Sequence, residues 1–181
     1  MKLVISDAHE GLKADRVGGL GASWQRCRVH FTRNVLAKVP KGNAEMVAAA
    51  IRTIFAQPDA QHVRDQLDVI ATMLGRQLSV VESMLREGAD DILAFTAFPQ
   101  AHWRKIWSTN PLERVNKEIK RRTDVVGVFP NPEALLRLAG AVLVETHDES
   151  AAGERRYLSE ESMKTIDATT KEVATTPELT A

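Results

Sequence analysis

Residues 43–98 form a block in which apolar residues recur at spacings of three and four, and this block limits the fold more than any other feature. Such spacing is typical of helices that bury one face. Asp59, after a break at Pro58, has the position of an N-cap between two helices. Their apolar faces consist of Met46, Val47, Ala50, Ile51, Ile54 and Phe55, and of Val63, Leu67, Ile70 and Leu74. With two shorter helices expected up to Phe98, the block predicts an all-α unit.

Two short strands are predicted ahead of this block. The run Leu3-Val4-Ile5 is a buried strand that ends at Ser6-Asp7, and residues 24–29 alternate between two faces. A weak helix is expected over residues 9–20, where glycines make helix formation less favourable in free energy. A further helix is expected over residues 30–39. The mixture of strands and helices indicates an α/β class, in a chain that is helical for most of its length.

The segment after the block is predicted to open with an extended stretch or a short turn at HWRKIW, residues 102–107. Asn110-Pro111 then marks a helix start, with Asn as N-cap and Pro at the first helical position. This helix is expected to reach about residue 122, and another one spans residues 133–145. Residues 159–181 are rich in Ser, Thr and Glu without apolar periodicity, which predicts a disordered tail.

Composition fits a chain without membrane segments. Of its 181 residues 44% are hydrophobic and 27% are charged, and no apolar run approaches the roughly 18 residues of a membrane span. The start lacks the basic region and long apolar stretch of a signal peptide. The single Cys27 excludes an internal disulfide and fits a reducing compartment. We therefore expect a cytoplasmic protein with no membrane partner and no small-molecule cofactor.

Charge is uneven along the chain, although its 24 basic and 24 acidic residues balance. The first 37 residues carry six Lys or Arg and three Asp or Glu, and residues 101–144 carry eight and four. Local basic charge governs polyanion binding more than the total does. The two basic segments also hold the candidate motifs.

Glu113 and Asp7 are the two carboxylates of interest, and each has two interpretations. Glu113 lies three residues after Asn110, as in a capping box, or it is a metal ligand beside the basic residues of its helix. Asp7 follows a strand, where α/β proteins place reactive groups, or it caps the next helix together with Glu10. A pair of Mg²⁺ ions roughly 3.5–4 Å apart needs several carboxylates from separated positions, so neither residue builds such a site alone.

Two further pairs of residues are weaker signals. Cys27 and His30 have a spacing found in zinc sites, but a structural zinc needs four ligands and no second pair accompanies them. The other interpretation is a buried cysteine beside a hydrogen-bonded histidine. Trp103 and Trp107 either stack on unpaired bases or pack inside the protein.

Five stretches together resemble one family. In chain order they are VISDAHEGL, GASWQRCRVHFTRNVLAKVPK, AAAIRTIFAQPDA, HWRKIWSTNPLERVNKEIKRRTDVVGVFPN and LLRLAGAVLVETHDE. They are similar to the C-terminal part of the Mutator-type bacterial insertion-sequence transposases. The resemblance implies a ribonuclease-H-like core with a DDE triad, interrupted by an α-helical insertion. It also implies an enzyme that cuts and joins DNA with two Mg²⁺ or Mn²⁺ ions.

The resemblance assigns roles to individual residues. Asp7 matches the second Asp of the triad and Glu113 its Glu, so that both are implied catalytic residues and metal ligands. Cys27 and His30 match a Cys-x-x-His signature of the family. Together with Trp24 and Asn110, the residue that opens the family's Asn-x-x-Glu pattern, they are expected to support the site. The residues expected to bind DNA are Arg104, Lys105, Arg114, Lys117, Lys120, Arg121 and Arg122.

The implied organisation is an incomplete ribonuclease-H-like core. Residues 1–39 form the second half of the core sheet with Asp7, residues 40–99 the insertion, residues 100–158 the core helices with Glu113, and residues 159–181 the tail. In the family, the first Asp and a DNA-binding region lie upstream of the stretch around Asp7. We therefore expect a truncated transposase that is inactive alone. The alternatives are a non-catalytic DNA-binding or regulatory fragment that pairs with full-length transposase or with itself, and a helical interaction module.

Overall fold

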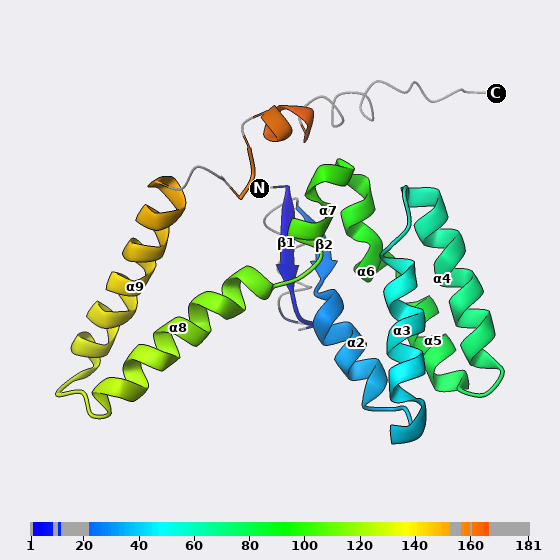
Figure 1. The fold of residues 1–181 in the computed structure, drawn as a ribbon, viewed down its shortest axis with the longest axis horizontal. Coiled ribbons are helices and arrows are strands. Elements are labelled where there is room, and N and C mark those ends of the chain that lie inside the picture. The colour runs from blue at the N-terminus through cyan, green and yellow to red at the C-terminus, as the bar shows by residue number, and fades with distance from the viewer. Residues whose placement is uncertain (1, 9–10, 12–21, 153–156, 160, 167–181) are drawn as a thin grey trace.

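The computed structural model describes residues 2–8, 11, 22–152, 157–159 and 161–166. Within these residues the chain is mostly helical and contains two short strands, β1 (Leu3–Ser6) and β2 (Ser23–Arg26), which pair in parallel (Figure 1). Val4 lies opposite Trp24 and Ser6 opposite Arg26. The weak helix expected over residues 9–20 lies almost entirely outside the described residues.

The second strand is shorter than its sequence pattern indicates. Alternation predicts an extended segment over residues 24–29, but β2 ends at Arg26 and Cys27 is already the N-cap of helix α2 (Arg28–Leu36). Beyond Arg26 the buried positions follow a helical spacing instead: Phe31 and Val35 of α2 are fully buried in the core that they share with the insertion. The strand and the helix therefore meet at Cys27 without a loop.

Residues 40–99, which we call the insertion after their expected place in the chain, contain only helical elements and connecting turns, as the apolar periodicity predicts. The bounds of its elements are η2 (Lys41–Asn43), α3 (Ala44–Ile54), α4 (Ala60–Gly75), α5 (Ser79–Glu87), α6 (Ala89–Leu93) and η3 (Ala94–Ala97). Asp59 is confirmed as the N-cap of α4, because its Oδ1 accepts a hydrogen bond of 2.9 Å from the backbone N–H of His62. The predicted apolar faces form its core except for Met46, which is 48% exposed. The core includes Val47, Ile51, Ile54, Val63, Leu67, Leu74, Val81 and Leu85.

Gln25 and Phe95 join the strands to the insertion. The buried side chain of Gln25 donates to the backbone carbonyl of Ile92 at 2.8 Å and accepts from the N–H of Phe95 at 2.7 Å. The Phe95 ring lies 5.1 Å from that of Trp103 and 5.7 Å from that of Trp107, both edge to face. The two tryptophans therefore pack inside the protein, which is the second of their two interpretations.

The segment HWRKIW is helical, which corrects the expectation of an extended stretch or turn. It lies in α7 (Gln100–Ile106), where a spacing of four places both Trp103 and Trp107 on the side that faces Phe95. Helix α8 (Asn110–Val126) follows, and its N-cap is Thr109 rather than the expected Asn110. It extends four residues past the predicted end, to Val126, and its C-cap is Gly127, whose φ of 75° suits a glycine.

Helices α8 and α9 (Pro132–Ala152) form a hairpin on one side of the strands, and the insertion lies on the other side (Figure 1). Residues 161–166, inside the predicted disordered tail, form a short helix, and residues 160 and 167–181 lie outside the described residues. No helix in the described part of the chain has the length and apolarity that crossing a membrane requires.

Candidate active site

The two strands end side by side, and Asp7 comes directly after one of these ends. Because β1 and β2 are parallel, Ser6 and Arg26 lie at the same edge of the pair. The indole N–H of Trp24 donates to the hydroxyl of Ser6 at 2.7 Å, and the backbone N–H of Cys27 donates to the Ser6 carbonyl at 2.8 Å. Buried Trp24 therefore supports the end of β1.

Cys27 ties the start of α2 to the start of α8. Its side chain is fully buried. Its Sγ accepts a hydrogen bond from the backbone N–H of Thr109 at 3.4 Å and lies 3.4 Å from the Thr109 hydroxyl oxygen. The N–H of Arg28 donates to the carbonyl of Trp107 at 3.0 Å. These contacts fix the N-terminus of α8 beside the strand ends.

Glu113 lies in the first turn of α8 and is held by two side chains. Its Oε1 is 3.1 Å from Nε2 of His30 and accepts from the hydroxyl of Thr109 at 3.1 Å. The Thr109 hydroxyl has one proton, so when it donates to the carboxylate, the Cys27 thiol can donate to Thr109. Three successive contacts thus connect Ser6, the neighbour of Asp7, with Glu113: through Cys27, then Thr109, to the carboxylate.

His30 is the second partner of Glu113 and comes from the first turn of α2. Its Nδ1 is buried and has no hydrogen-bond partner among the described residues. Cys27 and His30 are therefore not a pair of zinc ligands here: the histidine contacts the carboxylate directly, and the cysteine contacts it through Thr109. This matches the second interpretation of the pair, a buried cysteine beside a hydrogen-bonded histidine.

The two carboxylates suit a hard cation in their chemistry, because Mg²⁺ and Mn²⁺ prefer oxygen ligands. Asp7 is exposed, and its Oδ1 accepts from the N–H of Ala8 at 2.7 Å. Oδ2 of Asp7 and Oε2 of Glu113 have no hydrogen-bond partner within the described ranges. However, no three His, Cys, Asp or Glu residues in those ranges are grouped so that they could hold a metal ion. The donor type fits a hard cation, but the described residues do not assemble a site with three such ligands.

Asn110 does not act as the capping residue that the sequence predicts. It is exposed, it is the first residue of α8, and its side chain makes no hydrogen bond within the described part of the chain. The capping-box interpretation of Glu113 with Asn110 is therefore wrong, since the Glu113 carboxylate contacts Thr109 and His30 instead.

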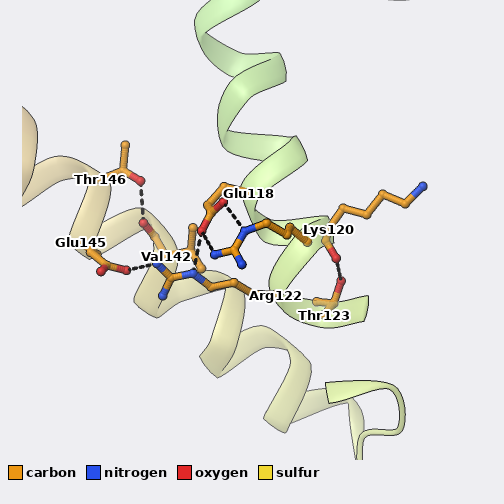
Figure 2. Close-up of polar contacts among 8 residues, drawn as sticks. Glu118, Lys120, Arg122, Thr123, Val142, Glu145 and Thr146 are labelled. Carbon is orange, nitrogen blue, oxygen red and sulfur yellow. Dashed lines mark hydrogen bonds and ion pairs between the residues drawn. The ribbon is translucent and has the colours of Figure 1, made fainter. Parts of the chain in front are cut away.

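The seven residues expected to bind DNA lie in three kinds of surroundings. Arg104, Arg114, Lys117 and Lys120 are exposed and have no ion-pair partner in the described ranges. Arg121 and Arg122 instead bind Glu118 at 2.7 and 2.8 Å, and Arg122 also reaches Glu145 of α9 at 2.6 Å. Figure 2 shows this network between the helices, with the Lys120 side chain directed away from it. The Lys105 ammonium lies 5.8 Å from the ring centroid of Tyr157.

The arginine pair has a clear electrostatic effect on Glu118. Hydrogen bonds from Arg121 and then Arg122 lower the pKa of its carboxyl from 4.5 to about 2. Arg122 therefore has a structural role in the α8–α9 hairpin and is not available to a phosphate in this arrangement.

Sequence reasoning missed Thr109 and Ser6, which complete the connection between the end of β1 and Glu113. The run Ser108-Thr109-Asn110-Pro111 offers three successive residues that cap helices well, and only the structure selects Thr109. Ser6 gives no signal apart from its place beside Asp7.

Comparison with known proteins identifies the family of this chain. A family model described as "Transposase, Mutator family" matches residues 1–153. The chain belongs to the Mutator family of transposases. It is 49% identical over 157 residues to the transposase for insertion sequence element IS1081 of Mycobacterium tuberculosis. It is 37% identical over 161 residues to that for IS256 in transposon Tn4001 of Staphylococcus aureus, and 37% identical over 169 residues to that for ISRM5 of Rhizobium meliloti.

The matches cover most of this chain but a smaller part of each relative. They span 86%, 87% and 91% of the chain, and 38%, 41% and 41% of the relatives' own lengths. The chain thus spans about two fifths of the length of these transposases. The matched region includes Asp7, Cys27, His30 and Glu113 within the residues of the family model.

Proposed function

We propose that this chain supplies part of the catalytic core of an insertion-sequence transposase, with Asp7 and Glu113 as two of three carboxylates that serve DNA cutting and joining. The observation that carries the proposal is the fixed orientation of Glu113, held by His30 and Thr109 beside the ends of two parallel strands. Family membership supports the same reaction class. The proposed architecture is a ribonuclease-H-like core interrupted by the helical insertion of residues 40–99.

The residues of the site have separate tasks in this proposal. His30 and Thr109 hold one oxygen of Glu113, which leaves the other oxygen for a cation. Divalent ions, when bound, activate the attacking oxygen and stabilise the leaving one. Cys27 anchors α8 to the strand end, so that Glu113 and Asp7 keep their relative places. Two carboxylates are too few for a pair of metal ions, so we expect this chain not to cut DNA by itself.

DNA binding is assigned to the exposed basic side of α8 and to α7. Arg114, Lys117 and Lys120 project from α8 without ion-pair partners in the described ranges, and Arg104 does so from α7. Phosphate contacts of this kind give a DNA affinity that decreases as the salt concentration rises and that does not depend on the base sequence. Arg121 contributes less, because Glu118 already neutralises it.

The carboxylates are tested by the binding of Mn²⁺ to the purified chain, measured by water-proton relaxation. Asp7→Asn and Glu113→Gln should each weaken binding by about tenfold, which is the loss of one charged ligand worth about 1.4 kcal/mol. Glu133→Gln, which removes a carboxylate from the far end of the hairpin, is the control and should leave binding unchanged. Equal affinities for all four proteins would overturn the assignment.

Strand-transfer assays with labelled element ends test the expected inactivity. The chain alone should give no product in Mg²⁺ or Mn²⁺. End cleavage by the chain that disappears in Glu113→Ala would show that the described carboxylates suffice, and would refute the expected inactivity while supporting the site.

A second candidate function is a regulatory fragment that pairs with full-length transposase. It is favoured by the outer side of α9, where Leu136 is 70% exposed, Leu143 52% and Val144 61%. Apolar side chains of this size on a helix commonly mark a contact with another polypeptide. Co-expression with a tagged full-length relative tests this: capture that is lost in Leu136→Asp/Leu143→Asp supports pairing through α9, and capture that survives excludes this surface.

A further inference from the structure

A groove between α2 and α3 combines an apolar floor with three arginines. It has a volume of about 370 Å³ and no acidic residue lines it. Leu36, Ile51 and Phe55 contribute to the floor, and Arg28, Arg33 and Arg52 are the charged residues. We call this surface the arginine groove. It lies outside the Asp7–Glu113 site and outside the basic side of α8.

Arg28 is the most constrained of the three arginines. Its guanidinium carbon lies 4.0 Å from the ring centroid of Trp107 and 5.3 Å from that of Phe55, in cation–π contact with both. Its Nε is buried and has no hydrogen-bond partner within the described ranges. Burial lowers the pKa of Arg28, and the nearby Arg104 lowers it further, yet an arginine stays charged at neutral pH. One end of the groove therefore holds a fixed positive charge.

Arg33 and Arg52 add exposed positive charge to the groove. Both are exposed, and neither has a carboxylate partner among the described residues. They differ in this respect from Arg86, Arg121 and Arg122, which all bind Glu or Asp. Three uncompensated guanidinium groups around one groove favour an anion, and arginine matches the oxygens of a phosphate with two parallel hydrogen bonds.

The apolar floor decides which phosphate-bearing molecule fits. In a duplex the base faces are stacked inside the helix and cannot reach a protein surface, whereas an unpaired strand presents both phosphates and base faces. We propose that the arginine groove binds a short stretch of single-stranded DNA, with phosphates on the arginines and a base face on the apolar floor. This proposal rests on the proposed function, because it assumes that DNA is the substrate.

The position of the groove relative to the candidate active site agrees with this role. Arg28 and Arg33 lie on α2, and the same short helix carries His30, the partner of Glu113. The arginine groove and the candidate active site are therefore built in part on the same nine-residue helix. The groove would hold unpaired DNA next to the position of cutting and joining.

The test is fluorescence anisotropy of a labelled thymidine 12-mer with the full 181-residue chain in EDTA. Arg33→Ala/Arg52→Ala should weaken binding by about tenfold and reduce the slope of log affinity against log salt by about 1.4, since each lost phosphate contact on a single strand accounts for about 0.7. Arg64→Ala/Arg76→Ala, which removes two exposed arginines from α4 and its C-terminal end, is the matched control and should change neither.

Competition distinguishes the possible occupants. Unlabelled single-stranded DNA should displace the probe at least tenfold better than duplex of the same length. Equal binding by the two double variants, or equal competition by duplex, overturns the proposal. A glutamate 12-mer that displaces the probe as well as single-stranded DNA also overturns it, in favour of an acidic protein partner. The absence of metal keeps this result independent of the Mn²⁺ test of Asp7 and Glu113.

Discussion

The insertion helices α3–α5 and the α8–α9 hairpin are both amphipathic, but they differ in what covers them. In the insertion, the apolar stripes face one another, and Val47, Ile54, Val63 and Leu85 are fully buried. In the hairpin, Val142 is the one buried residue among the described positions of the two helices. Leu112, Val125 and Leu136 are more than half exposed.

This difference shows what an apolar stripe predicts and what it leaves open. Helix α9 packs against α8 on the side that includes Val142 and leaves Leu136 and Leu143 exposed on other sides. A helix that is apolar on both sides is normally covered on both. The core side of the insertion is therefore covered, although Val69 and Val80 on its other sides are more than half exposed, whereas the hairpin buries Val142 alone among its described positions. Substitutions matched between the two regions test this contrast.

The largest expected effect is that of Phe95→Ala, which removes a fully buried ring in contact with Phe55, Trp103 and Trp107. We expect a loss of about 3–5 kcal/mol in the free energy of unfolding, measured by urea denaturation. Leu136→Ala on the hairpin is the control and should change this free energy by less than about 0.5 kcal/mol. A similar loss in both variants would mean that the hairpin is packed as tightly as the insertion.

Replacing a glycine by alanine should destabilise the insertion but stabilise the hairpin. In Gly88→Ala, the new Cβ would lie 2.8 Å from the Phe31 ring and 2.9 Å from the backbone carbonyl of Met84. Neither the ring in the core nor the backbone can move easily, so we expect a destabilisation of about 1–3 kcal/mol. Thermal unfolding followed by circular dichroism measures it, and an unchanged midpoint would contradict the tight packing between α2 and α5.

Gly140→Ala is the counterpart in α9. The added Cβ meets nothing within 4 Å, and alanine is the better helix former by about 0.5–1 kcal/mol. We therefore expect a small stabilisation, seen as slower amide hydrogen exchange within α9. Faster exchange would indicate that another part of the molecule approaches the hairpin at this position.

The sequence predicts the insertion well because its helices cover one another. Periodicity alone locates the buried faces of α3 and α4, and Asp59 is the cap that its position indicates. The sequence-based prediction fails at HWRKIW, because two tryptophans four residues apart are compatible with a turn as well as with one side of a short helix. Only the aromatic contacts with Phe95 distinguish these alternatives.

The candidate site is less predictable than the fold, because its contacts join distant parts of the chain. The sequence identifies Glu113, His30 and Cys27 as residues of interest, but no spacing rule indicates that His30 contacts Glu113. The role of Thr109 is hidden for a different reason: it stands among Ser108 and Asn110, which cap helices equally well. The arginine groove arises in the same way, from helices that meet only after folding.

The smallest expected effect concerns the ion pairs that hold the hairpin together. Hydrogen bonds from Arg121 and Arg122 lower the pKa of Glu118 from 4.5 to about 2 in the folded chain. A lowered folded-state pKa means that the stabilisation is complete above about pH 4.5 and is lost as the pH falls through about 2. The difference in thermal midpoint between the natural chain and Glu118→Gln should therefore be constant near neutral pH and shrink to zero in that window. Carbon NMR of the Glu118 carboxyl checks the cause directly, since a pKa near 4.5 would show that the network of Figure 2 does not persist in solution.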